Sequence, residues 1–267
     1  MKTNKVTIVD LLKKKKAGEK IVFLTAYDYF TAQYLDQSGV DGLLVGDSVN
    51  MVIYGHETTH SLPMDQIIYH TEAVSRGSSH ALVVGDMPFM SYQTSPAEAA
   101  HNAGRFIKEA RAQAVKLEGG IEMEETVMHL VDGGIPVMGH IGLTPQSIFK
   151  FGGYKVQGKK DAEKAYLIES ALALEESGCF AIVLEAIKAE LAVEITEKLA
   201  IPTIGIGAGS GCDGQIMVIN DILGMDDEFD ARFVRRYFNL SDTIKDVAKK
   251  FVEDVKSGNY PSEKESY

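Results

Sequence analysis

The chain has 267 residues, a formal net charge of -11 and two cysteines, Cys179 and Cys212. The excess of acidic residues argues against a general nucleic-acid-binding protein, which needs basic patches to hold phosphates. The two cysteines do not form a CxxC pair, which argues against a disulfide framework and favours a reducing compartment.

No stretch of the sequence has the apolar length of a signal peptide or of a membrane-spanning helix. We therefore expect a cytoplasmic protein that does not use a membrane as a partner.

Eight short apolar runs recur along the chain, each followed by a turn rich in Gly, Asp or Pro and then by a helical stretch. The runs do not alternate with polar residues, which is typical of strands that are buried on both faces. Strands that alternate with amphipathic helices indicate a parallel sheet. Eight such units in a chain close to the roughly 250 residues of a TIM barrel favour a single (β/α)8 barrel over an open, doubly wound sheet. The expected strands cover residues 21–27, 42–47, 81–87, 114–119, 135–142, 180–186, 201–209 and 215–221.

The carboxyl-terminal region differs from the barrel units. Residues 231–255 predict a helix, and its aromatic residues Phe233, Tyr237 and Phe238 need a partner surface, such as another subunit. Residues 257–267 predict a flexible polar tail. Because no linker divides the chain, we interpret residues 1–267 as one β/α-barrel domain.

Charged and polar residues occur where five consecutive expected strands end. In a β/α barrel the catalytic residues lie at the carboxyl ends of the strands, so these side chains should meet at one rim. They comprise four carboxylates, a lysine, a histidine and a serine: Asp47, Ser48, Asp86, Lys116, Glu118, His140 and Glu185.

Four carboxylates at one rim need a compensating positive charge. Two unit charges about 4 Å apart repel by about 4 kcal/mol at an effective dielectric constant of 20, and Lys116 supplies only one positive charge. Carboxylate oxygens are hard ligands that suit Mg²⁺ or Mn²⁺. Asp47 and Asp86 are the better candidates for metal ligands, because each follows a glycine that lets a ligand approach. The alternative is that one or more of the acids caps the following helix.

Two further features leave their roles open. His140 is an auxiliary candidate as a general acid, an orienting hydrogen-bond partner, a metal ligand or a structural residue. The glycines between Gly205 and Gly211 are compatible with a phosphate-binding loop after the seventh strand. Close packing of the backbone explains them slightly better.

Several motifs resemble one enzyme family over about residues 21–224. They are GDSVNMVIYGHETTHSLPMD, GDMPFMSY, AVKLEGG, GHIGLTPQS and IGIGAGSGCDGQIMVINDILG. In this order they resemble the ketopantoate hydroxymethyltransferases of the pantothenate and coenzyme A pathway.

The resemblance implies a (β/α)8 barrel that transfers a hydroxymethyl group from 5,10-methylenetetrahydrofolate to 2-oxoisovalerate (3-methyl-2-oxobutanoate), giving ketopantoate. It also implies Mg²⁺ as cofactor and a cytoplasmic homodecamer. Its motifs assign Glu185 as the base that removes the C3 proton. They assign metal binding to Asp47, Asp86 and Glu118, and keto-acid binding to Asp47, Ser48, Asp86 and Lys116.

The chain departs from the family pattern at three places. It has Val49-Asn50 where the family usually has Leu-Gly, and Ala186-Ile187-Lys188 where a Val-Pro pair usually follows the base. The family's glycine loop also tends to differ from Gly209-Ser210-Gly211. These departures bear on the folate side of the site and on the choice of substrate. Three alternatives stay open at this point: a Mg²⁺-dependent keto-acid lyase or mutase, a Schiff-base aldolase with Lys116 as nucleophile, and a non-catalytic binding barrel.

Overall fold

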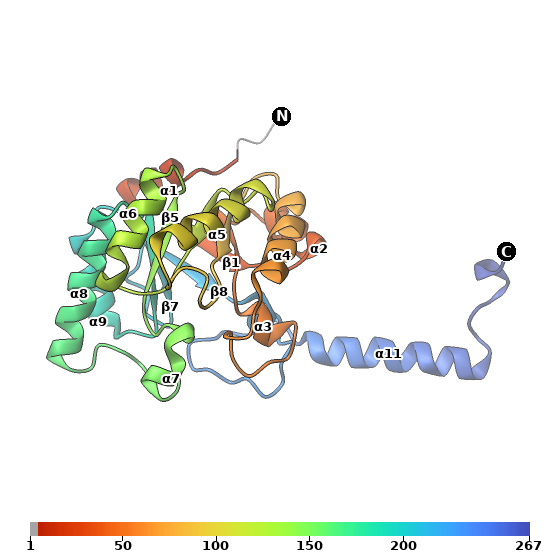
Figure 1. The fold of residues 1–267 in the computed structure, drawn as a ribbon. Coiled ribbons are helices and arrows are strands. Elements are labelled where there is room, and N and C mark those ends of the chain that lie inside the picture. Colours follow the sequence, from red (N-terminus) through yellow and green to blue (C-terminus); the bar gives the residue numbers. More distant parts are fainter. Residues whose placement is uncertain (1–4) are drawn as a thin grey trace. The chain divides into compact units, whose positions relative to one another are not determined.

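Eight parallel strands close into a barrel in the computed structural model, which describes residues 5–267 (Figure 1). Each strand pairs with its neighbours in chain order, and β8 closes the ring on β1. The expected (β/α)8 barrel is thereby confirmed and the open sheet is excluded. The strands are β1 (Ile21–Thr25), β2 (Gly42–Val45), β3 (Leu82–Asp86), β4 (Ala114–Lys116), β5 (Val137–Gly142), β6 (Ala181–Glu185), β7 (Thr203–Ile206) and β8 (Gly214–Met217).

Helices surround the barrel, and those from α2 to α9 lie in the connections between consecutive parallel strands (Figure 1). Helix α5 illustrates how the sequence specifies them. The Ser95 side chain accepts a hydrogen bond from the backbone N–H of Glu98, and Pro96 occupies the first turn. Ala99, Ala103 and Phe106 then repeat at helical spacing and are buried. The helices are α1 (Ile8–Ala17), α2 (Tyr29–Gln37), α3 (Val49–Val52), α4 (Met64–Gly77), α5 (Pro96–Lys108), α6 (Glu124–Asp132), α7 (Ile148–Phe151), α8 (Asp161–Glu176) and α9 (Ala189–Lys198), with 3₁₀ turns at Ile121–Met123 and Pro145–Ser147.

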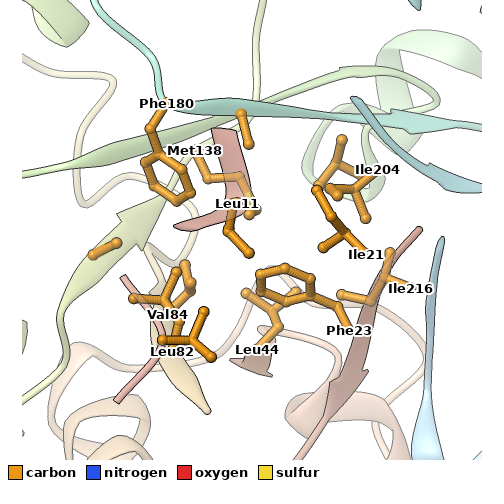
Figure 2. Packing of buried hydrophobic residues seen from close by; sticks show 14 residues of the cluster. Leu11, Ile21, Phe23, Leu44, Leu82, Val84, Met138, Phe180, Ile204 and Ile216 are labelled. Carbon is orange, nitrogen blue, oxygen red and sulfur yellow. The ribbon is translucent and has the colours of Figure 1, made fainter. Parts of the chain in front are cut away.

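The inside of the barrel is an apolar core (Figure 2). Leu11 of α1 packs among inward-facing side chains of all eight strands, which include Phe23, Leu44 and Met138. This core is continuous, so the barrel is not a pore. Polar chemistry must therefore lie beyond it, toward the carboxyl ends of the strands.

The glycine-rich segment after β7 packs closely against α9. A Cβ atom at Gly211 would lie 2.3 Å from Cγ2 of Val193, and one at Gly209 would lie 2.7 Å from Cβ of Ala189. Close backbone packing, the interpretation that we favoured from the sequence, therefore accounts for these glycines.

The chain divides into two compact units, one reaching to Met217 and the other from Val218 to Tyr267. The second unit contains α10 (Ile219–Leu223), α11 (Leu240–Ser257) and a 3₁₀ turn at Glu263–Glu265. The interpretation of residues 1–267 as one domain stays a prediction. None of the helices in residues 5–267 combines the length and the apolar composition that crossing a bilayer requires.

The helix predicted at 231–255 begins only at Leu240, so the prediction was wrong for residues 231–239. Backbone groups of this unit are instead used in loop contacts. The guanidinium of Arg236 donates hydrogen bonds to the carbonyls of Asp226 and Phe229, and the N–H of Tyr237 bonds to the carbonyl of Ile222. The three aromatic side chains singled out from the sequence are exposed, at 44% for Phe233, 71% for Tyr237 and 52% for Phe238.

Candidate active site

The strand faces that line the barrel change from apolar to charged toward their carboxyl ends. Side chains two residues apart in a strand point to the same side. Each charged residue therefore continues the inward-facing row of a core residue. The pairs are Val84 and Asp86 in β3, Ala114 and Lys116 in β4, Met138 and His140 in β5, and Val183 and Glu185 in β6. The sheet register brings the charged residues together.

Lys116 is the positive centre of this group. Its Nζ atom lies 2.8 Å from Oδ1 of Asp86 and 3.8 Å from Oε1 of Glu118. The register pairs Lys116 directly with Asp86, which explains the shorter contact. Burial by itself lowers the pKa of Lys116, but the carboxylates of Asp86, Glu118 and Asp47 outweigh it and raise the pKa. Lys116 is therefore a charged ammonium group.

Asp47 and Asp86 are buried next to each other. The backbone N–H of Asp47 donates to Oδ2 of Asp86 at 3.0 Å. Burial raises the pKa of both carboxyls, and the charge of Glu118 raises both further, while Lys116 opposes the shift. Neither residue caps a helix: α3 begins without a side-chain cap, and the cap of α5 is Ser95. The helix-cap alternative is excluded for these two acids.

His140 connects the buried group to Glu185. Its Nδ1 atom lies 3.4 Å from Oε1 of Glu118, and its Nε2 atom lies 3.2 Å from Oε2 of Glu185. Burial and Lys116 lower the pKa of His140, but hydrogen bonds to the two glutamates outweigh them and raise it to about 9. In this protonated form His140 forms an ion pair with each of the two glutamates. The 3.2 Å contact between Nδ1 and Nζ of Lys116 is then not a hydrogen bond, because neither group can accept.

The carboxylate of Glu118 differs from those of the two aspartates. Burial raises its pKa, but the hydrogen bond and charge of His140, the charge of Lys116 and the N–H of Gln146 lower it below the ordinary value. Glu185, in contrast, has a side chain that is 18% exposed. A carboxylate at the edge of the buried group can face a substrate while Glu118 remains inside.

Ser48 lies beside this network. Its Oγ atom is 2.8 Å from the hydroxyl of Tyr27, and it is the residue immediately before α3. The structure thus places all seven residues predicted from the sequence at the carboxyl ends of β2 to β6. Six of them are joined by direct contacts, and Ser48 adjoins Asp47 in the chain.

The backbone turns sharply directly after Glu185. Ala186 has φ = 46°, a left-handed conformation that is costly for a residue with a Cβ atom. Its N–H and carbonyl are nevertheless both bonded, to Ile206 and Gln157 respectively. Strain of this kind is often found where a functional side chain must be aimed, and here it follows the exposed carboxylate.

The sequence interpretation missed one central residue, Gln146. Its Nε2 donates to Oδ2 of Asp47 at 2.8 Å and to the carbonyl of Met87 at 3.0 Å. Its Oε1 lies 2.7 Å from the hydroxyl of Tyr92 and accepts from Nε2 of Gln93 at 3.0 Å. The four partners define the orientation of the amide, because a flipped amide would place its oxygen against a carboxylate and a carbonyl. No spacing rule indicates Gln146; only its place in the GHIGLTPQS motif could have done so.

The glycine before Asp86 has a different role from the one we expected. A Cβ atom at Gly85 would lie 2.2 Å from Cδ1 of Phe106. Gly85 therefore makes room for the ring that α5 packs onto the outside of the barrel, not for a ligand. The argument that a preceding glycine marks Asp86 as a metal ligand was wrong.

The donor set of the site suits a hard divalent cation. When all four carboxylates are ionised, Lys116 and His140 balance only two of them. Burial raises the pKa of Asp47 and Asp86, the charge of Glu118 raises both further, and Lys116 offsets this only in part. Mg²⁺ commonly uses one or two protein carboxylates and completes its shell with water and substrate. Within residues 5–267, no three His, Cys, Asp or Glu side chains are arranged to hold one ion together.

Comparisons with known proteins agree with the motifs. The family described as ketopantoate hydroxymethyltransferase matches residues 5–263. The 3-methyl-2-oxobutanoate hydroxymethyltransferase of Syntrophus aciditrophicus (strain SB) is 54% identical over 266 residues, which cover 100% of this chain and 98% of that protein. The protein of the same name from Chlorobaculum parvum (strain DSM 263 / NCIMB 8327) is 54% identical over 266 residues, covering 98% of this chain and 96% of that protein.

Among solved structures, a phosphonopyruvate hydrolase in complex with oxalate and Mg²⁺ has a similar fold. The TM-score is 0.62 at 13% sequence identity, with 97% of this chain and 92% of that chain covered. At this identity the likeness concerns the fold alone.

Proposed function

The chain belongs to the ketopantoate hydroxymethyltransferase family, and on that premise we propose that it converts 3-methyl-2-oxobutanoate into ketopantoate, with 5,10-methylenetetrahydrofolate as one-carbon donor. It is a hydroxymethyltransferase. The observation that carries the substrate and the mechanism is the buried ionic group at the carboxyl ends of the strands. There the charged Lys116 lies near Glu118, and His140 lies between Glu118 and the partly exposed Glu185.

Asp47 and Asp86 are the residues that would hold a Mg²⁺ ion, or Mn²⁺ in its place, with Glu118 nearby as a direct or water-mediated partner. Burial and the nearby charge of Glu118, which raise the pKa of both carboxyls, support this assignment. When bound, such an ion polarises the keto and carboxylate oxygens of the substrate as a Lewis acid.

The side chains divide the remaining work by position. Ser48 donates a hydrogen bond to the substrate carboxylate. Glu185 accepts the C3 proton of the keto acid, and the ammonium of Lys116 stabilises the negative charge that then develops on the keto oxygen. C3 forms the new bond to the one-carbon unit. The net reaction consumes one water, which supplies the new hydroxyl group, and releases tetrahydrofolate.

Lys116 is not suited to form a Schiff base. A nucleophilic lysine must be deprotonated, whereas the carboxylates around Lys116 raise its pKa. Sodium borohydride together with 3-methyl-2-oxobutanoate should therefore leave the protein unmodified, as judged by intact mass. A mass increase that Lys116→Arg abolishes would favour the aldolase alternative.

The direct test of the function is an assay for ketopantoate in which each component is omitted in turn. We expect product only when 3-methyl-2-oxobutanoate, 5,10-methylenetetrahydrofolate and Mg²⁺ are all present. Product without the folate, or cleavage of the keto acid by the protein alone, would point to a lyase.

The metal assignment has its own test, which does not depend on turnover. Calorimetric titration with Mg²⁺ should give binding to the parent protein and none to Asp86→Ala. A matched control is Asp10→Ala, because the carboxylate of Asp10 contacts only Lys13 and the hydroxyl and N–H of Thr7, within and next to α1. Equal Mg²⁺ affinity in the parent and Asp86→Ala would remove Asp86 from the ligand set.

The proposal includes a cytoplasmic homo-oligomer, a decamer by resemblance to the family. Helix α11 supports self-association, because a row of its apolar side chains is exposed: Ile244 at 49%, Val247 at 65%, Phe251 at 54% and Val255 at 47%. Light scattering should report a multimer at micromolar concentration, and Phe251→Glu should reduce its mass. A monomeric parent would contradict the assembly.

A further inference from the structure

Three aromatic rings cluster beside the ionic group. The ring centroid of His60 lies 4.7 Å from that of Phe89 and 4.6 Å from that of Phe149. The three residues come from the segments that follow β2, β3 and β5, so all lie on the carboxyl side of the barrel. Phe149 is 75% exposed and Phe89 is 37% exposed. Two exposed phenylalanine rings next to an imidazole leave apolar surface that a flat ligand can cover.

The cluster is attached directly to the residue that holds Asp47. Nε2 of His60 is 2.9 Å from the backbone carbonyl of Gln146, while the side chain of Gln146 donates to Oδ2 of Asp47. One residue therefore separates the aromatic rings from the carboxylate proposed to bind the keto acid. Phe89 is likewise three residues beyond Asp86. A ligand on the rings would be adjacent to one at the ionic group.

His60 also offers a directional polar contact. A carbonyl can only accept a hydrogen bond, so Nε2 of His60 carries the proton in the neutral imidazole, and Nδ1 is an acceptor. Nδ1 is buried and has no hydrogen-bond partner among the described residues. Leaving such an atom unpaired costs about 1 to 3 kcal/mol, which a ligand N–H group would offset.

The backbone around the cluster is held in place. Nδ2 of Asn50 donates to the carbonyl of Thr58 at 2.7 Å and to the hydroxyl of Ser61 at 2.9 Å, which fixes the loop on both sides of His60. Met90, directly after Phe89, has φ = 65°, a left-handed conformation that costs energy for a residue with a side chain. Strained residues of this kind concentrate at functional sites.

We propose that His60, Phe89 and Phe149 form the subsite for the flat, N–H-bearing ring system of the one-carbon donor, next to the keto-acid site. This inference rests on the proposed function, since that reaction requires a second substrate with such a ring beside the first. The phenylalanine rings stack on the ligand, and Nδ1 of His60 accepts a hydrogen bond from it.

The test compares three variants with the parent. Phe149→Leu removes the aromatic ring, Phe149→Tyr retains it, and Tyr69→Leu changes a side chain on α4 that is 70% exposed and serves as the matched control. Stacking of a ring on an aromatic side chain contributes about 1 to 3 kcal/mol. We therefore expect Phe149→Leu to raise the KM for methylenetetrahydrofolate by about 5- to 150-fold, while Phe149→Tyr and Tyr69→Leu stay near the parent value.

Two readouts separate the subsite from other roles. Exchange of the C3 proton of 3-methyl-2-oxobutanoate with deuterated water, followed by NMR without folate, should be the same in the parent and Phe149→Leu. Light scattering should give the same mass for both. An unchanged donor KM, or a loss of proton exchange that matches the loss of turnover, would overturn the inference. So would a smaller assembly with an unchanged donor KM, because the rings would then bind a second copy of the chain.

Calorimetric binding of tetrahydrofolate separates this inference from the proposed function. If the parent makes no ketopantoate but binds tetrahydrofolate and Phe149→Leu does not, the subsite stands and the proposed reaction fails. If the parent makes ketopantoate and Phe149→Leu binds tetrahydrofolate equally well, the reaction stands and the subsite fails.

Discussion

Replacing Gln146 by methionine should damage both stability and the ionic group, although Gln146 carries no charge. Methionine has a similar length and no amide, so the change removes hydrogen bonds with little loss of volume. In the structure the amide makes one hydrogen bond to the carboxylate of Asp47 and three to neutral groups, from Met87, Tyr92 and Gln93.

The size of the effect follows from these four bonds. A hydrogen bond to a charged group contributes about 1.5 to 3 kcal/mol, and a neutral one contributes about 0.5 to 1.5 kcal/mol. The sum of the lower limits is about 3 kcal/mol, and Gln146 is only 5% exposed. For a domain of this size each kcal/mol corresponds to about 2 to 4 °C in Tm. We therefore expect Gln146→Met to melt about 6 to 12 °C below the parent.

The assay is thermal melting together with C3 proton exchange. Gln93→Met is the matched control. It removes one neutral hydrogen bond from the same amide and one from the N–H of Tyr92, and should lower the free energy of unfolding by about 1 kcal/mol. Exchange should fall in Gln146→Met, since Asp47 loses its side-chain hydrogen-bond donor, and should persist in Gln93→Met. A Gln146→Met protein that melts within 2 °C of the parent and exchanges normally would refute this reasoning.

Three further predictions concern the base, a core contact and the pH dependence of stability. Glu185→Gln should lose about 10² to 10⁴ in the rate of C3 proton exchange and still bind Mg²⁺ in calorimetry. Exchange at the parent's rate would show that another residue is the base. Gly85→Ala should lower the free energy of unfolding in urea by about 1 to 3 kcal/mol, because the new methyl group would lie 2.2 Å from Cδ1 of Phe106. An unchanged free energy of unfolding would show that the Phe106 ring moves freely out of the way. The pKa of His140 is about 9 in the folded protein against 6.5 for the free side chain, so its protonated form stabilises the fold. In metal-free protein this contribution, about 3 kcal/mol, should be complete below pH 6.5 and be lost as the pH rises through 9. In urea titrations, His140→Asn should not show this loss of stability between pH 6.5 and 9. If the parent and His140→Asn had the same pH profile of unfolding free energy, the prediction would be wrong.

The sequence was sufficient to predict the barrel, because its main signals are local. A run such as residues 81–87 is apolar throughout, and a strand buried on both faces needs that composition. The alternation of eight such runs with amphipathic segments then indicates parallel strands. The boundary of α11 was not predicted, because the loop contacts of Arg236 and Tyr237 that replace a helix at 231–239 leave no local pattern.

The sequence also determined which charged residues meet, since position at a strand end is enough to bring Asp86, Lys116 and Glu185 to one rim. It could not determine how they are connected. That His140 bridges two glutamates, and that Gln146 orients Asp47, depends on side-chain contacts between residues from separate strands and loops. Gly85 shows the same limit. A side chain at this position would collide with the ring of Phe106 in α5, which is 21 positions away in the chain. Hydrogen bonds and close packing act over a few ångströms in space, so only the tertiary structure decides them.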